Sequence, residues 1–158
     1  MDQNHLARHH AELDQRAEVL LTTADGGDCH DLALAWGHFE SEVLRHFELE
    51  EDELFRRFQP EHPDEVAALT QQHEALRRDV LALGISAELH SLRAEGVRAF
   101  IAELRAHGVR EEETLYRWAG TNVEGDTWAR IARGLRETRD AVSKRIADEL
   151  SELGARSL

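Results

Sequence analysis

Residues 46–56 read HFELEEDELFR, and residues 107–117 read HGVREEETLYR. Both stretches follow the pattern H-x3-E-E-x2-L-aromatic-R, which indicates two copies of one structural unit. Helix residues four apart lie on the same face, so each copy directs its histidine and its first glutamate to one side of a helix.

The segments that precede these stretches also resemble each other. Residues 10–13 read HAEL, and residues 73–76 read HEAL. The chain therefore looks like two helical hairpins of similar design. Each hairpin has one histidine on its first helix and an H-x3-E pair on its second.

Helical periodicity extends over most of the chain. We expect helices over about residues 3–21, 31–58, 65–83 and 86–119, and a fifth after residue 126. Gly84 is expected to end the third helix and Ser86 to cap the fourth. Short connections favour antiparallel neighbours, which predicts an all-α, up-down-up-down four-helix bundle over residues 1–120. Residues 121–158 are expected to form an amphipathic helix that packs on the bundle or on a partner subunit.

Composition and charge exclude several classes of protein. The net charge of −13 leaves no basic face for neutralising phosphates, so no nucleic-acid partner is expected. No segment approaches the roughly 20 apolar residues of a membrane span, and the start lacks an apolar signal region. Cys29 is the single cysteine, which excludes an internal disulfide and disfavours thiolate metal sites. We expect a cytoplasmic protein with no membrane partner.

Histidines and glutamates interrupt the apolar stripes of the four expected bundle helices. They are His10, His46, Glu50, His73, His107 and Glu111. A carboxylate that faces a bundle core without partners costs several kcal/mol or stays protonated. Imidazole and carboxylate groups without thiolates suit iron, manganese or zinc, and carboxylates can bridge two ions. The pattern therefore predicts a metal centre inside the bundle.

Two choices between adjacent residues stay open. Either His9 or His10 faces the core, and the HAEL/HEAL match favours His10. Either Glu111 or Glu112 is the second inward glutamate, and the symmetry with Glu50 favours Glu111.

The order H…H-x3-E…H…H-x3-E over about residues 5–120 resembles the hemerythrin-like (HHE cation-binding) family. The resemblance implies a centre of two non-haem irons joined by an oxo or hydroxo bridge. The ligands that it implies are His10, His46, Glu50, His73 and His107, with Glu111 or Glu112 completing the set. Members of this family bind oxygen reversibly, sense oxygen or iron, or handle nitric oxide and peroxide. We therefore expect O2, peroxide or NO as the small ligand.

The chain departs from the oxygen-carrying hemerythrins at two positions. Those proteins have H-x3-H on the third helix, where this chain has Arg77, and an aspartate where it has Glu112. Loss of one histidine leaves more open coordination. This favours reaction with O2 or peroxide over reversible carriage, with catalase-like dismutation of hydrogen peroxide as the most concrete form.

The alternative is an iron- or oxygen-sensing module without turnover, in which the fifth helix contacts a partner. A homodimer through that helix is one form of such contact. Arg77 either neutralises a glutamate near the site or faces solvent. Tyr116 aligns with Phe55 in the repeat, so packing is its expected role.

Overall fold

The computed structural model describes residues 5–26 and 29–156, and these residues form helices without any strand. The first hairpin consists of α1 (His5–Gly26) and α2 (Cys29–Glu50). A five-residue π-helix, η1 (Glu51–Phe55), and the short α3 (Arg56–Phe58) extend α2. The second hairpin consists of α4 (Pro63–Glu88) and α5 (Ala94–Glu113), which α6 (Leu115–Asn122) extends. The last helix is α7 (Gly125–Arg156).

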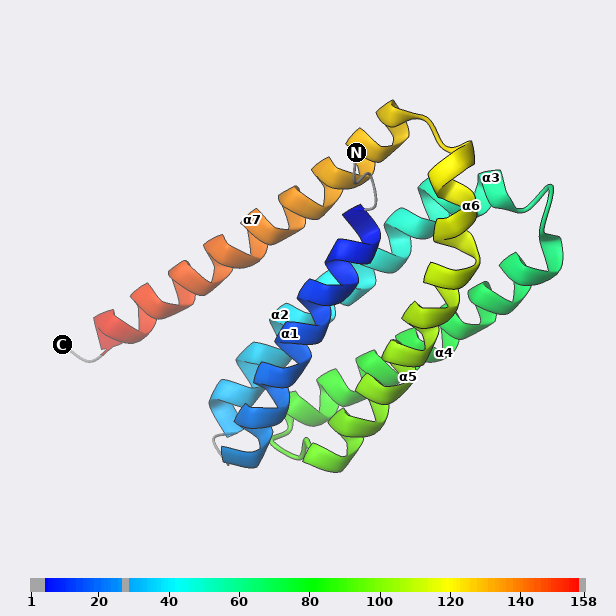
Figure 1. Ribbon diagram of the computed structural model, residues 1–158. Helices are drawn as coiled ribbons and strands as arrows, with labels where there is room; N and C mark the ends of the chain where they lie inside the picture. Colours follow the sequence, from blue (N-terminus) through cyan, green and yellow to red (C-terminus); the bar gives the residue numbers. More distant parts are fainter. Residues whose placement is uncertain (1–4, 27–28, 157–158) are drawn as a thin grey trace.

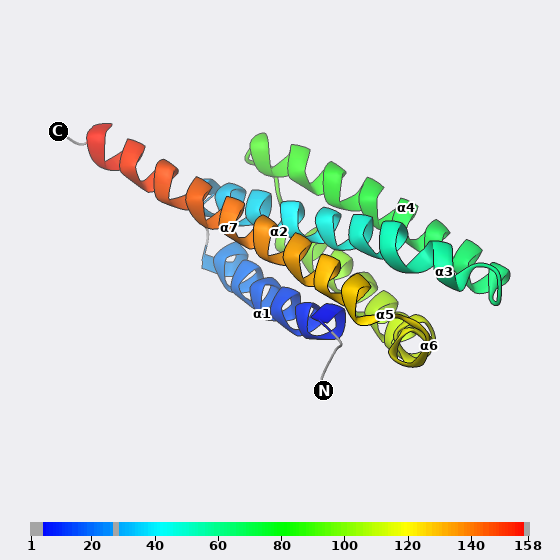
Figure 2. The same ribbon diagram turned by 90° about the horizontal axis from the view of Figure 1, so that it is seen from above.

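The two hairpins pack into a closed ring of four helices (Figure 1). Helix α1 lies against α2 and α5, and α4 lies against the same two helices from the other side. Helix α7 runs along α2 and also contacts α1, outside the ring (Figure 2). The predicted all-α, up-down-up-down bundle with an added C-terminal helix is confirmed.

Two apolar clusters fill the bundle, and a polar layer separates them between the four bundle helices. One cluster contains Leu6, Leu54, Leu69 and Leu115, among others. The other contains Leu13, Phe47, Leu76 and Ile101, among others. Burying each such side chain contributes about 1.5–3 kcal/mol. Because both ends of the bundle are tightly packed in this way, the helices hold the polar residues between the clusters in fixed positions.

Helix α4 runs past Gly84, so the predictions that this glycine ends the helix and that Ser86 caps the next one are wrong. A Cβ at Gly84 would lie 2.6 Å from Oε2 of Glu40 on α2, so a larger residue here would displace the end of the Glu40 side chain. The helix ends instead at a Schellman motif, in which the Ser91 N–H donates to the Ser86 carbonyl (2.8 Å). His90 occupies the left-handed position with φ 55°.

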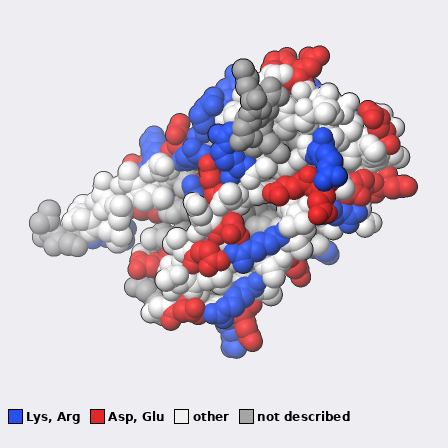
Figure 3. Space-filling model, in the orientation of Figure 1, with Lys and Arg blue, Asp and Glu red and all other residues white. Residues whose placement is uncertain are grey.

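Helix α7 buries the first part of its apolar stripe against the bundle. Trp128, Ile131 and Val142 are buried, whereas Leu150 is 64% exposed on the end that extends beyond the other helices (Figure 1). On the face shown in Figure 3, basic side chains are interspersed with acidic ones. Among the helices of residues 5–26 and 29–156, none is both long and apolar enough to cross a membrane.

Candidate metal centre

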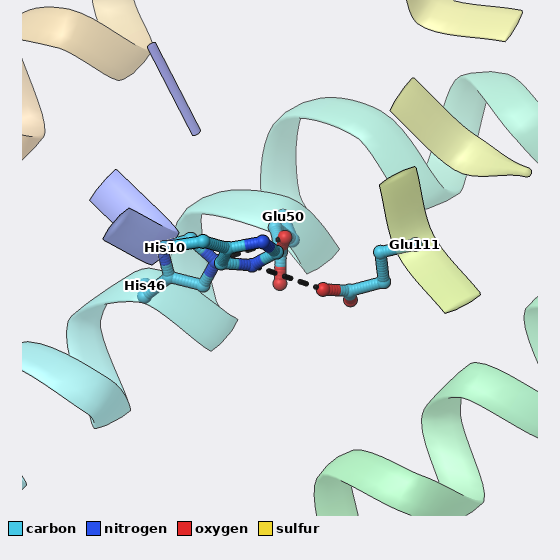
Figure 4. Close-up of side chains that lie close together, drawn as sticks. All are labelled: His10, His46, Glu50 and Glu111. Atoms are coloured by element: carbon cyan, nitrogen blue, oxygen red, sulfur yellow. Dashed lines mark hydrogen bonds and ion pairs between the residues drawn. The ribbon is translucent and has the colours of Figure 1, made fainter. Parts of the chain in front are cut away.

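The polar layer brings together side chains from all four bundle helices in two groups that suit metal ions. In the first group, His10, His46, Glu50 and Glu111 each offer one atom, and these atoms all lie within 4.8 Å of one another. Figure 4 shows the two imidazoles beside the two carboxylates. The Nε2 atoms of His10 and His46 are 2.9 Å apart, and Nε2 of His46 lies 3.1 Å from Oε1 of Glu50.

The second group consists of His73, His107, Glu50 and Glu111, under the same distance limit. Nε2 of His107 lies 2.9 Å from Oε1 of Glu111. Nε2 of His73 lies 3.3 Å from Oε2 of Glu50 and 3.2 Å from Oε1 of Glu111. All four side chains are buried.

Glu50 and Glu111 belong to both groups, whereas each histidine belongs to only one. The i, i+4 spacing aligns each glutamate with a histidine on its own helix, and the ring of helices brings the two carboxylates together. Carboxylates shared by two pairs of imidazoles form a donor set that accommodates two cations side by side.

The electrostatics of the cluster favour a positive charge between the carboxylates. Burial and the charge of Glu111 would each raise the pKa of Glu50, but His46 and His73 lower it overall. Burial would likewise raise the pKa of Glu111, but its histidine neighbours hold it well below the usual range. Burial would lower the pKa of His73, whereas Glu111, Glu50 and Glu51 raise it to about 11. Positive charge next to the two buried carboxylates thus stabilises their charged form.

Three polar atoms of the cluster are buried without a hydrogen bond of good geometry among the described residues. They are Oε2 of Glu50, Oε2 of Glu111 and Nε2 of His107. Such orphaned atoms are costly in a packed interior. Each has a lone pair that can bind a cation, so the donor set fits metal binding.

On the α1 side, the Nδ1 atoms of His10 and His46 point away from the two ligand groups. They contact Glu112 and His9, the two residues that the sequence left as alternative ligands. Nδ1 of His10 lies 3.1 Å from Oε1 of Glu112, and Nδ1 of His46 lies 2.8 Å from Nδ1 of His9. His9 and Glu112 are in neither group, so they lie behind the inward histidines. Outer hydrogen bonds of this kind fix the ring orientation of a metal-binding histidine.

On the α4 side, the outer partners are a carboxylate and an amide. Nδ1 of His73 lies 2.8 Å from Oε1 of Glu51, and Arg77 donates to both oxygens of that carboxylate (2.8 Å each). Nδ1 of His107 lies 2.8 Å from Oε1 of Gln72. Arg77 therefore neutralises a glutamate next to the site instead of facing only solvent.

Tyr116 lies in the site, although the sequence suggested only a packing role. Its hydroxyl donates a short hydrogen bond to Oε1 of Glu50 and lies 3.0 Å from Nε2 of His10. Burial and the charges of Glu50 and Glu111 raise its pKa well above the usual range, so the hydroxyl keeps its proton. Phe55, its equivalent in the repeat, stacks on the ring of His73 (5.0 Å between centroids). The replacement of phenylalanine by tyrosine in the repeat was the only sequence signal for this role.

Both glutamate-bearing helices change geometry within three residues after the shared carboxylates. The π-helix begins at Glu51, and the break between α5 and α6 falls at Thr114 (φ −113°, ψ −78°). Single-turn π-helices are frequent at functional sites.

Comparisons with known proteins agree with this geometry. The family description "Hemerythrin HHE cation binding domain" matches residues 1–119, which include every histidine and glutamate of the two groups. No curated protein and no solved structure matches the chain. A match over most of the chain, together with a buried histidine and glutamate cluster, shows a metal-binding module. The chain belongs to the hemerythrin HHE cation-binding domain family.

Proposed function

We propose that this protein binds two non-haem iron ions and uses them to react with O2 or peroxide. His10 and His46 would hold one ion, His73 and His107 the other. Glu50 and Glu111 would be shared between the two. The observation that supports this proposal is the membership of both glutamates in both ligand groups.

The donor set suits an open, reactive iron site and not a closed structural metal site. Each ion would have two imidazoles and shared carboxylates, which leaves positions for a small exogenous ligand. When bound, iron supplies one-electron redox chemistry and Lewis acidity that amino-acid side chains lack.

The surrounding residues suit a reactive centre. The Tyr116 hydroxyl holds a proton next to Glu50 and is 3.2 Å from Nε2 of His46, so a donor is available at one side of the cluster. Phe47 and Phe55 stack on His73 with centroid distances of 4.2 and 5.0 Å, and they cover this imidazole with apolar surface. The protein thus presents a proton donor and an apolar wall at opposite ends of one centre.

The test is anaerobic loading with ferrous iron, followed by separate additions of O2 and hydrogen peroxide. We expect about two irons per chain, consumption of O2 or peroxide, and a change in the visible spectrum. Glu111→Gln should lose most of the bound iron. Glu112→Gln should retain iron with affinity lowered about 10- to 100-fold at one ion, as outer partners usually cause. The exposed Glu113→Gln is the matched control and should behave as the wild type.

Two irons without consumption of O2 or peroxide would favour an iron- or oxygen-sensing module. Equal iron contents in Glu111→Gln and Glu113→Gln would refute the ligand assignment.

A further inference from the structure

We propose that a pocket between α1 and α5 binds an uncharged, largely apolar organic molecule next to the metal centre. The pocket has a volume of about 420 Å³ and reaches His10, His46 and His107. Binding of this molecule does not depend on the proposed function. Its reaction as a substrate at the metal centre would rest on that function.

The size of the pocket exceeds what O2 or peroxide requires. An apolar cavity of about 150 Å³ holds one benzene molecule, and typical ligand pockets measure about 300–1,000 Å³. The observed volume is therefore suited to a molecule of roughly two fused rings or a short hydrocarbon chain.

The walls of the pocket are apolar. Ala11 and Leu13 from α1 face Ile101 and Leu104 from α5, and Phe47 contributes from α2. An apolar molecule gains about 25 cal/mol for each Å² of apolar surface that it removes from water. The lining therefore favours hydrocarbon surface in the ligand.

The charges around the pocket disfavour an anion. Asp14 and Glu112 line it, and Arg105, which also lines it, donates to Asp14 and Glu18. The Arg105 guanidinium is thus already paired with two carboxylates, and Oε1 of Glu112 lies 3.1 Å from Nδ1 of His10. A ligand carboxylate would meet repulsion here, whereas a neutral molecule would not.

The inner end of the pocket gives this ligand access to the centre. His10, His46 and His107 lie there, and the side chain of His10 is 16% exposed. A molecule that fills the pocket would therefore have one end against the imidazoles that hold the proposed irons.

The experiment is isothermal titration calorimetry with 2-naphthalenemethanol and with 2-naphthoate, which share a ring system and differ in charge. Each is titrated into metal-free and iron-loaded protein. Ala11→Phe and Leu104→Phe narrow the pocket from opposite walls, and Ala106→Phe adds the same ring at an exposed position of α5 outside it. Thermal melting of each variant shows whether it is folded.

We expect the alcohol to bind wild-type protein in both metal states, and the naphthoate to bind metal-free protein at least about tenfold more weakly than the alcohol does. Folded Ala11→Phe or Leu104→Phe should raise the Kd of the alcohol at least about tenfold, and Ala106→Phe by less than about twofold. No binding of the alcohol, or equal binding to all folded variants, would overturn the proposal. The metal-free titrations test binding of the alcohol without any iron. Failure of this proposal is therefore distinguishable from failure of the proposed function, which is tested by iron content and reactivity.

Discussion

Gly108 permits α5 to approach His10 closely. Its replacement by alanine should weaken metal binding strongly and change the free energy of unfolding only a little. A Cβ at this position would lie 3.2 Å from Nδ1 and 3.3 Å from Cε1 of His10. These separations are shorter than ordinary van der Waals contacts, so the imidazole must move by a few tenths of an ångström. That movement disturbs the 3.1 Å contact between His10 and Glu112.

Two opposing effects set the change in unfolding free energy. Alanine is favoured over glycine inside a helix by about 0.8–1.0 kcal/mol. Crowding in a packed interior costs about 1–3 kcal/mol. The metal-free Gly108→Ala protein should therefore lose between roughly 0 and 2 kcal/mol. Affinity for the metal ion at His10 should fall about 10- to 100-fold, because the ring loses its orientation.

Gly37→Ala is the matched control, because a Cβ there would meet nothing within 4 Å. This variant should gain only the higher helix propensity of alanine, without any crowding. That gain raises Tm by about 2–4 °C for a chain of this size. Metal-free melting and chelator competition for ferrous iron measure the two effects. If Gly108→Ala matched Gly37→Ala in both stability and iron affinity, the close packing of α5 on His10 would be refuted.

Three further predictions concern other parts of the centre. Tyr116→Phe removes the hydrogen bond to Glu50 and should lower the stability of the metal-free protein by about 1.5–3 kcal/mol, measured by urea unfolding; an unchanged midpoint would contradict the contact. Arg77→Met releases Glu51 from its bidentate partner and should weaken iron binding about tenfold in chelator competition, whereas the exposed Arg78→Met should not. Metal removal should lower stability by about 2.7 kcal/mol for each site relative to free metal at 100 times its Kd, or about 5.4 kcal/mol and roughly 11–22 °C in Tm for two sites; equal melting with and without metal would show that the ligands do not bind it in the folded state.

The sequence repeat predicted most of the fold and most of the residues that face the bundle interior. Histidines and glutamates at positions where hydrophobes were expected had to face the bundle interior, and the structure brings His10, His46, His73 and His107 together with the two glutamates there. Adjacent residues were harder to separate, because neighbouring helix positions differ by only about 100° around the axis. His9 and Glu112 differ from the members of the two ligand groups only in the assembled bundle, where they contact His46 and His10.

Other features depended on contacts that no local pattern encodes. Gly84 looks like a helix terminator, yet it lies inside α4 next to the Glu40 carboxylate. Tyr116 differs from Phe55 by one hydroxyl, and only the assembled bundle shows that this hydroxyl reaches Glu50. The pocket between α1 and α5 likewise arises from small side chains on two helices that are distant in sequence.

The most direct test of the central claim is a crystal structure of the iron-loaded protein with anomalous data collected at the iron absorption edge. The account predicts two iron peaks, one beside His10 and His46 and the other beside His73 and His107, with Glu50 and Glu111 contacting both. A single peak, or iron bound by Glu112 in place of Glu111, would contradict it.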